Sequence, residues 1–203
     1  ADDADGYGPL ELTRALVRRL ADEKSVPKLA ASAARMVQLM IGYDRVMIYK
    51  LLHNGAGRVI AEQKRADLGS FLNQHFPASD IPVQARELYK RSWIRMISDV
   101  RYTPQPVLPA LKKSEAPLDM SYAQLRSVSP VHCEYLQNMG VDASMSISIM
   151  VEGELWGLIA CHHYSPKAVP LPQRIGAALF AQYCSLPADT LERHDRPDIP
   201  STH

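Results

Sequence analysis

The residues best suited to do chemistry lie in the segment 129–140, SPVHCEYLQNMG. His132 and Tyr135 are three positions apart, so a helix would place both on the same face. Gly140 follows them and can take the left-handed conformation that ends a helix. The pattern predicts a short helix whose polar face forms the wall of a pocket and contacts a polar group.

A strand with small hydroxyl side chains is predicted next, over residues 143–149. Apolar and polar residues alternate there, and a strand sends alternate side chains to opposite faces. We expect Met145 to pack in the core, and Ser144, Ser146 and Ser148 to lie on the other face. That face is either solvated, which is the simpler interpretation, or close to a flat ligand that carries hydrogen-bonding groups.

A second strand is predicted over residues 155–164, because the turn at 151–154 reverses the chain. This strand ends in His162 and His163, whose side chains should point to opposite sides of the sheet. The hairpin therefore brings a histidine towards the serine face.

The rest of the sequence predicts the elements that must position these residues. Helical spacing of apolar residues predicts helices over 10–21, 27–41, 82–91 and 170–186, and β-branched residues predict strands over 45–51, 57–62 and 93–100. A proline-rich loop is expected over 102–118, and Pro187 is expected to end the last helix. This order favours an antiparallel sheet with helices on its faces over a parallel sheet.

The composition predicts a single domain. A chain of 203 residues with 46% hydrophobic residues can bury one core. We place the domain at 9–188, between tails at 1–8 and 189–203. A net charge of +1 with dispersed basic residues disfavours nucleic acid as a partner. No apolar run approaches the roughly 20 residues that span a bilayer, and the acidic N-terminus is unlike a signal peptide, so we expect a cytoplasmic protein without a membrane partner.

The three cysteines, at positions 133, 161 and 184, have neither metal-site spacing nor an even count. Free thiols in a reducing compartment, and no metal site, are the expectation.

Four segments together resemble the GAF domain of bacterial phytochromes, which are biliverdin-binding receptors for red light. They are FPASDIP at 76–82, SPVHCEYLQNMG at 129–140, ASMSISI at 143–149 and LWGLIACHHYSP at 155–166. They agree with that family in order and spacing, and the resemblance covers about residues 9–186. It implies a GAF fold, in which helices sandwich a central antiparallel sheet, and an enclosed pocket for a linear tetrapyrrole.

The resemblance also implies the polar contacts of the bilin. The backbone oxygen of Asp80 would accept hydrogen bonds from pyrrole nitrogens, His132 would hold a water below them, and His162 would bond the carbonyl of the isomerising ring. Arg95 and Arg126 would clamp a propionate, for which guanidinium geometry is well suited. From the residues alone, Asp80 is equally explained as a helix cap, and each arginine as a surface ion pair.

Further contacts follow from the same resemblance. Aromatic walls are expected from Tyr49, Phe76, Tyr89 and Tyr135, and hydroxyls near the second propionate from Ser144 and Ser146. Ile81, Pro82 and Met145 complete the expected contacts. Taken singly, such aromatic residues are more often ordinary core.

Covalent attachment is where the sequence departs from the family. Bacterial phytochromes use a cysteine ahead of a PAS domain that precedes the GAF domain, and we expect that region to be absent here. Plant and many cyanobacterial relatives use a GAF cysteine just before the histidine, where this chain has Val131. Cys133 is rotated by about 100° from His132 on a helix. Noncovalent binding, an atypical link through Cys133 and absence of pigment all remain open.

The predicted function is red/far-red light sensing by photoisomerisation of biliverdin, without enzymatic turnover and coupled to signal transduction. PAS and PHY-type domains and a histidine kinase would belong to a longer parent protein, and without the sealing domain we expect incomplete or quickly reversing photoconversion. The alternative is a pigment-free GAF module that senses a cyclic nucleotide or dimerises through its first and last helices. A cysteine nucleophile beside a histidine is a weaker third hypothesis.

Overall fold

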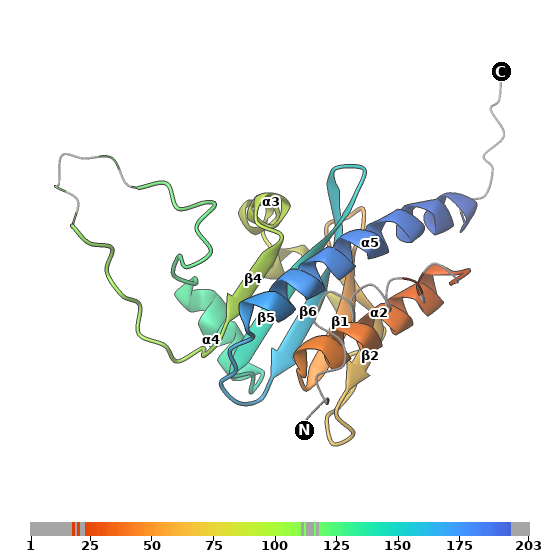
Figure 1. Cartoon of the computed structure of the whole chain (residues 1–203), viewed down its shortest axis with the longest axis horizontal. Coiled ribbons are helices and arrows are strands. Elements are labelled where there is room, and N and C mark those ends of the chain that lie inside the picture. The colour runs from red at the N-terminus through yellow and green to blue at the C-terminus, as the bar shows by residue number, and fades with distance from the viewer. Residues whose placement is uncertain are drawn as a thin grey trace, which may run out of the picture.

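The computed structural model describes residues 18, 20, 23–110, 112, 116 and 118–195 (Figure 1). Its helices are α2 (Val26–Ile41), the 3-10 helix η1 (Ala78–Asp80), α3 (Val83–Arg91), α4 (Pro130–Asn138) and α5 (Leu171–Asp195). Its strands are β1 (Arg45–Leu51), β2 (Gly57–Lys64), β3 (His75–Phe76), β4 (Ile94–Ile97), β5 (Ala143–Val151) and β6 (Glu154–His163). Most of the helix expected over 10–21, the tail 1–8 and residues 196–203 lie outside the described residues.

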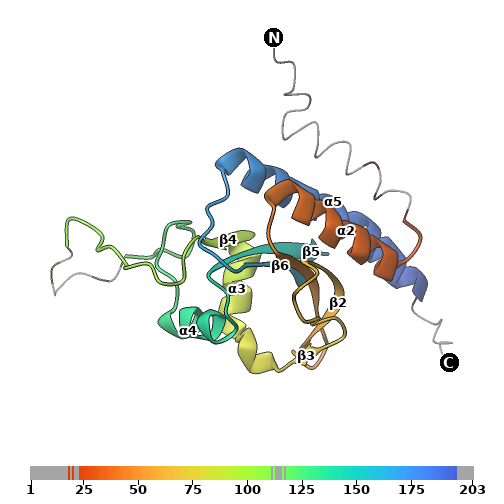
Figure 2. The ribbon, with the colours of Figure 1, turned by 90° about the horizontal axis from the view of Figure 1, so that it is seen from below.

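The strands form one antiparallel sheet in the order β3-β2-β1-β6-β5-β4. Figure 2 shows α2 and α5 side by side on one face of this sheet, and α3 and α4 on the opposite face. The expected antiparallel sheet between helices is therefore confirmed. The connection from β4 to α4 extends beyond the edge of the sheet (Figures 1 and 2).

The main core lies between the sheet and the pair α2 and α5. Val37 from α2, Ile48 and Ile159 from the sheet and Phe180 from α5 are each at most 1% exposed. Burying a side chain of this size stabilises the fold by about 1.5–3 kcal/mol. This core fixes the sheet and leaves its other face to the polar residues.

Local sequence signals explain where the central elements begin and end. Pro27 occupies the first turn of α2, and Gly42 ends that helix with a φ of 64°. The turn between β5 and β6 has positive φ at Glu152 and Gly153, 51° and 82°, the geometry that a tight antiparallel hairpin needs. The β5–β6 register that results places Ser144 opposite His162.

Two expectations about element boundaries were wrong, and two short elements were missed. Helix α5 continues through Pro187 to Asp195, so proline does not end it. Proline removes the amide donor for the carbonyl of Tyr183, and a helix can continue past a proline as a kinked helix. Strand β4 covers only Ile94–Ile97 of the expected 93–100, and the short β3 and η1 carried no periodic signal that could have predicted them.

Within the described part of the chain, no helix is both long and apolar enough to cross a lipid bilayer.

Gly157 in β6 permits the close approach of β1, and this gives a test of the sheet. A Cβ at position 157 would lie 2.4 Å from the carbonyl oxygen of Tyr49 and 3.3 Å from Cα of Lys50, so backbone must move. We expect Gly157→Ala to lower the free energy of unfolding by about 1–3 kcal/mol, as overpacking does. Urea unfolding measures this.

The matched control is Gly69→Ala, because a Cβ there meets nothing within 4 Å. This change should alter stability by less than about 1 kcal/mol. Equal midpoints for the two variants would show that the β1–β6 contact does not require glycine.

Candidate functional site

The polar face of the sheet is buried, because α3 and α4 cover it (Figure 2). Ser144 is 5% exposed, Ser148 is fully buried and His162 is 8% exposed. Ser148 donates a hydrogen bond from Oγ to the carbonyl of Tyr89 at 2.8 Å. The solvated interpretation of the serine face was therefore wrong, and these hydroxyls belong to an enclosed layer between the sheet and the covering helices.

Asp80 and α4 meet above this face. The Tyr135 hydroxyl donates to Oδ2 of Asp80 at 3.3 Å, although the two residues are far apart in sequence. The rings of His132 and Tyr135 stack with centroids 6.3 Å apart and an interplanar angle of 11°. The expected shared helix face of His132 and Tyr135 is thus confirmed. Asp80 caps neither η1 nor α3 with its side chain, so the capping alternative is not observed.

The segment that carries Asp80 is held by Arg86. Its guanidinium donates to the carbonyl of Ile81 from Nε at 2.7 Å, and from Nη2 to the carbonyls of Gly55 and Ala78. Arg86 is therefore a structural anchor of this segment. The sequence places Arg86 one turn into α3, but the distant carbonyls that it bonds could not be inferred from residue spacing. Ile81 packs against the aromatic residues of the site, and Pro82 precedes α3 and is exposed.

An aromatic wall stands over β1 and β2. The rings of Tyr49 and Phe76 lie 5.8 Å apart, and Phe71 meets Phe76 edge-on at 6.4 Å. Tyr89 and Ile81 pack against the same cluster. Phe71, which the sequence analysis missed, joins the wall through the loop between β2 and β3.

The tyrosine hydroxyls at this wall are held in their protonated form. Burial first, and then the charge of Asp80, raises the pKa of Tyr49 to about 12. The same causes, together with the hydrogen bond to Asp80, raise the pKa of Tyr135 to about 12. Both hydroxyls are therefore available as hydrogen-bond donors at neutral pH.

Arg95 and Arg126 gather positive charge beside β4. Arg95 donates to the carbonyls of Gln124 and Arg126 at 3.2 and 2.7 Å, and Arg126 donates to those of Ser121 and Ala123 at 3.0 and 3.3 Å. Among the described residues, the recorded partners of both guanidiniums are thus neutral carbonyls. Burial, and then the charge of Arg126, lowers the pKa of Arg95.

The two arginines line a cavity of about 260 Å³ at the edge of the sheet, with Tyr102, Val128 and other residues of the β4–α4 connection. Ser146 pairs with Arg95 in the β4–β5 register. Burial raises the pKa of Tyr89, while its hydrogen bond with Ser146 and the charges of Arg95 and Arg126 lower it, so Tyr89 belongs to the same group. A group of cations with neutral partners attracts an anion. The arrangement therefore suits a carboxylate.

Both histidines of the site are neutral at pH 7. Burial, followed by the charge of Arg95, lowers the pKa of His132. Burial, followed by the charges of Arg45 and His132, lowers the pKa of His162 to about 4. Nδ1 of His162 is buried and has no hydrogen-bond partner among the described residues.

The three thiols are buried. Cys133 is 8% exposed and Cys161 is fully buried in the main core, and burial raises the pKa of both. The expectation of free thiols is confirmed for all three cysteines. Because the thiolate is the nucleophile, none of these side chains is prepared for covalent chemistry.

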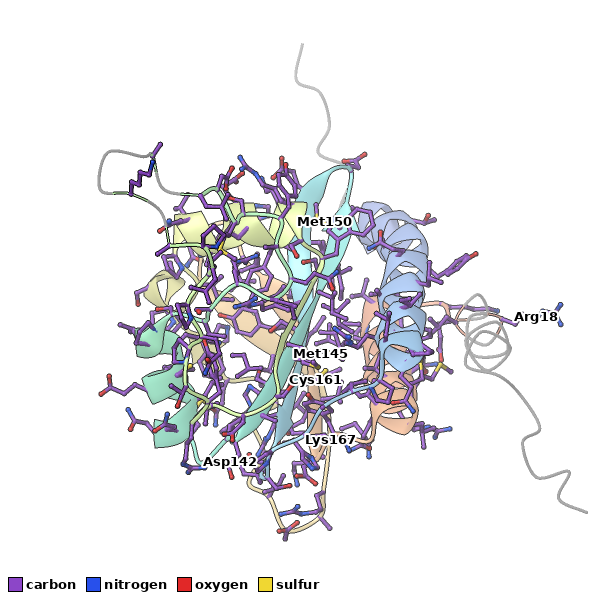
Figure 3. The ribbon with its side chains drawn as sticks, turned by 60° about the vertical axis from the view of Figure 1, so that its left-hand side comes forward. Arg18, Asp142, Met145, Met150, Cys161 and Lys167 are labelled. Carbon is purple, nitrogen blue, oxygen red and sulfur yellow. The ribbon has the colours of Figure 1, made fainter. Side chains whose placement is uncertain are left out.

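Met145 does not join the other predicted contacts. It is fully buried on the opposite face of β5, against α2 and α5, as is Cys161 on β6 (Figure 3). Strand alternation places it there, so its inclusion among the bilin contacts was an error. His163 points away from His162, as expected, and its Nδ1 lies 2.9 Å from Oδ2 of Asp44.

Comparison with known proteins agrees with this architecture. Residues 25–184 match the model of the GAF domain family. A bacteriophytochrome of Pseudomonas aeruginosa is 54% identical over 166 residues, which are 81% of this chain and 23% of that protein. Cyanobacterial phytochrome B of Nostoc is 43% identical over 197 residues, 95% of this chain and 26% of that protein. The chain thus spans about a quarter of the length of these relatives.

A solved structure is also similar. The crystal structure of the chromophore-binding domain of an unusual bacteriophytochrome from R. palustris superposes with a TM-score of 0.87 at 39% identity. The match covers 91% of this chain and 61% of that one. The chain therefore belongs to the GAF domain family, and the relatives and the structure that it matches here are phytochromes.

Proposed function

We propose that this chain is a bilin-binding photoreceptor domain and that its pigment is biliverdin. The observation that carries the proposal is the pair Arg95 and Arg126, whose charges face each other with neutral carbonyl partners. A linear tetrapyrrole brings two propionates, and a carboxylate between two guanidiniums forms charge-assisted hydrogen bonds. The similarity to phytochromes supports the same conclusion.

The residues present fit the other demands of a bilin. A conjugated tetrapyrrole needs apolar and aromatic walls, which Tyr49, Phe76, Tyr89 and Ile81 provide. It also carries a ring carbonyl and pyrrole nitrogens. His162 is a neutral, largely buried imidazole on the same face of the sheet, and the Asp80 carboxylate accepts a hydrogen bond from Tyr135. Such sites are largely preformed, apolar and equipped with a few directed polar groups.

Each protein group then has a definite task. The bound bilin would supply the absorption of red light and the isomerisation of a double bond, with no chemical turnover. The guanidiniums of Arg95 and Arg126 bind the acid groups, and Ser144 and Ser146 add hydroxyls on the sheet. Neutral His162 offers a hydrogen bond to the ring carbonyl.

We propose that no cysteine of this chain itself forms a covalent link to the pigment. Cys133, the only cysteine adjacent to a proposed contact residue on α4, is buried, and burial raises its pKa. A thiol in that state reacts slowly with an unsaturated side chain.

Roles of a longer parent protein are proposals as well. Light-driven signalling through neighbouring PAS and PHY-type domains and a cytoplasmic location follow from the resemblance to phytochromes, as does a kinase output.

Biliverdin titration tests the main proposal. Added to the purified chain, biliverdin should give a sharpened far-red absorption band. Arg95→Gln and Arg126→Gln, made singly, should weaken binding by about tenfold to a hundredfold, because each removes charge-assisted hydrogen bonds. The control Arg35→Gln alters an exposed residue of α2 and should bind like the unchanged chain.

The absence of any band with the unchanged chain would contradict the proposal and favour the pigment-free module. Equal affinity of the arginine variants would instead contradict the assigned carboxylate clamp alone.

Denaturing electrophoresis with zinc-induced bilin fluorescence tests the attachment. We expect no fluorescent protein band, because buried thiols do not capture the pigment, and Cys133→Ser should behave in the same way. Absorption before denaturation shows that each sample was loaded with pigment. A fluorescent band that disappears in Cys133→Ser would identify Cys133 as the anchor and overturn noncovalent binding.

A homodimer through the terminal helices is a further proposal. Leu171, Ile175, Leu179 and Tyr183 recur every four residues along α5 and are 42–53% exposed. Such a stripe is typical of a helix that packs against another helix.

Light scattering of Ile175→Glu with Leu179→Glu should show a smaller mass than that of the unchanged chain. Val83→Glu, at an exposed residue of α3, is the control. A monomeric unchanged chain would contradict the proposal.

A further inference from the structure

Arg45 is buried beside His162 on the face of the sheet that carries the site. The β1–β6 register pairs the two residues directly, and they are 2% and 8% exposed. Directly paired residues of neighbouring strands have Cβ atoms about 4.5–5.5 Å apart and share a face.

The guanidinium of Arg45 is fixed on most of its sides. Nη1 forms an ion pair with Glu62, and Nη2 donates to the carbonyl of Gly69 at 2.8 Å and to the hydroxyl of Tyr164 at 3.3 Å. The group also stacks on the ring of Phe71, with Cζ 4.0 Å from the centroid. Arg45 therefore cannot swing out towards solvent without breaking a buried ion pair.

Two buried polar atoms remain unpartnered at this pair among the described residues. They are Nε of Arg45 and Nδ1 of His162. The Nε–H group is a donor, and the Nδ1 atom of a neutral imidazole is an acceptor when the ring proton is on Nε2. A buried polar atom without a partner costs about 1–3 kcal/mol, so two complementary ones on paired residues favour a shared hydrogen bond.

We propose that Arg45 is a positioning residue for His162: its Nε–H donates to Nδ1, directly or through one buried water, and so fixes the tautomer that carries its proton on Nε2. The ring then presents an N–H donor to the ligand. A neighbouring group that sets the tautomer in this way decides which nitrogen works. That this donor meets a bilin carbonyl rests on the proposed function.

Burial lowers the pKa of His162 most, and the charges of Arg45 and His132 add to this effect. Arg45 on β1 is a permanent cation, His132 on α4 adds repulsion whenever it is protonated, and Ser144 on β5 is neutral. Glu62 on β2 offsets part of the Arg45 charge. Protonation of His162 would place a second cation beside the guanidinium, so the imidazole stays a neutral donor as the pH falls.

Nitrogen NMR of the whole chain with labelled histidine, without pigment, tests the inference. His162→Gln identifies the signals of His162 by their loss. In the unchanged chain the proton should be on Nε2, and the ring should stay neutral from about pH 8 down to about pH 5. Arg45→Met with Glu62→Gln removes both charges of the pair, and there we expect mixed tautomers and a pKa of His162 that rises but stays below the ordinary value of about 6.5, because burial remains.

Arg45→Lys separates the hydrogen bond from the charge, because it keeps the cation and lacks Nε–H. It should mix the tautomers while the ring still resists protonation. The control is Arg101→Met with Asp142→Asn, an ion pair whose arginine is 62% exposed, and it should leave His162 unchanged.

A proton on Nδ1 in the unchanged chain would overturn the inference, even if every variant failed to fold. The inference would also be overturned if Arg45→Met with Glu62→Gln kept the original tautomer and pH profile of His162. Since none of these measurements needs pigment, a failure of biliverdin to bind would refute the proposed function and leave this result to be judged separately.

Discussion

The antiparallel register of β1, β6 and β5 determines which side chains of this domain can meet. One residue of slip would move every side chain to the other face of the sheet. In the observed register Arg45, His162 and Ser144 form a row on one face. Ile48, Ile159 and Ile147 form a matching row on the other. The apolar row packs against α2 and α5. Because this packing fixes the sheet, it also fixes the position of the polar row under α3 and α4.

A buried polar face is costly to build, and ion pairing and packing offset that cost. Arg45 and Glu62 expose only 2% and 3% of their side chains, and loss of one partner from such a pair costs about 3–5 kcal/mol. Glu62 also accepts hydrogen bonds from Ser70 and from the amide of Phe71, and these lower its pKa although burial opposes them. The pair therefore ties the β2–β3 loop, and with it the aromatic wall, to the strand that faces His162.

The sequence was sufficient wherever local spacing alone decides the structure. Strict alternation predicted the β5–β6 hairpin, and the spacing of His132, Tyr135 and Gly140 predicted α4 with its end. It was insufficient where the partner of a side chain is a backbone carbonyl on a distant segment. Arg86 bonds the carbonyl of Gly55 and Arg95 that of Gln124, and every residue type carries such a carbonyl. Met145 was a different error, because the alternation that placed it in the core already excluded it from the serine face.

The carbonyl partners of Arg95 and Arg126 also bear on how the site responds to an anion. All of the carbonyls described as their partners belong to residues 121–126, in the connection that leads to α4. The guanidinium–carbonyl bonds have one charged partner, whereas a carboxylate would add the opposite charge and the bidentate geometry that guanidinium favours. A carboxylate therefore competes successfully with these carbonyls for the guanidinium N–H groups. Exchange at Arg95 loosens the tie between β4 and the segment before α4, and exchange at Arg126 loosens bonds within that segment. Occupancy of the anion site and the position of the segment are therefore linked by the same hydrogen bonds.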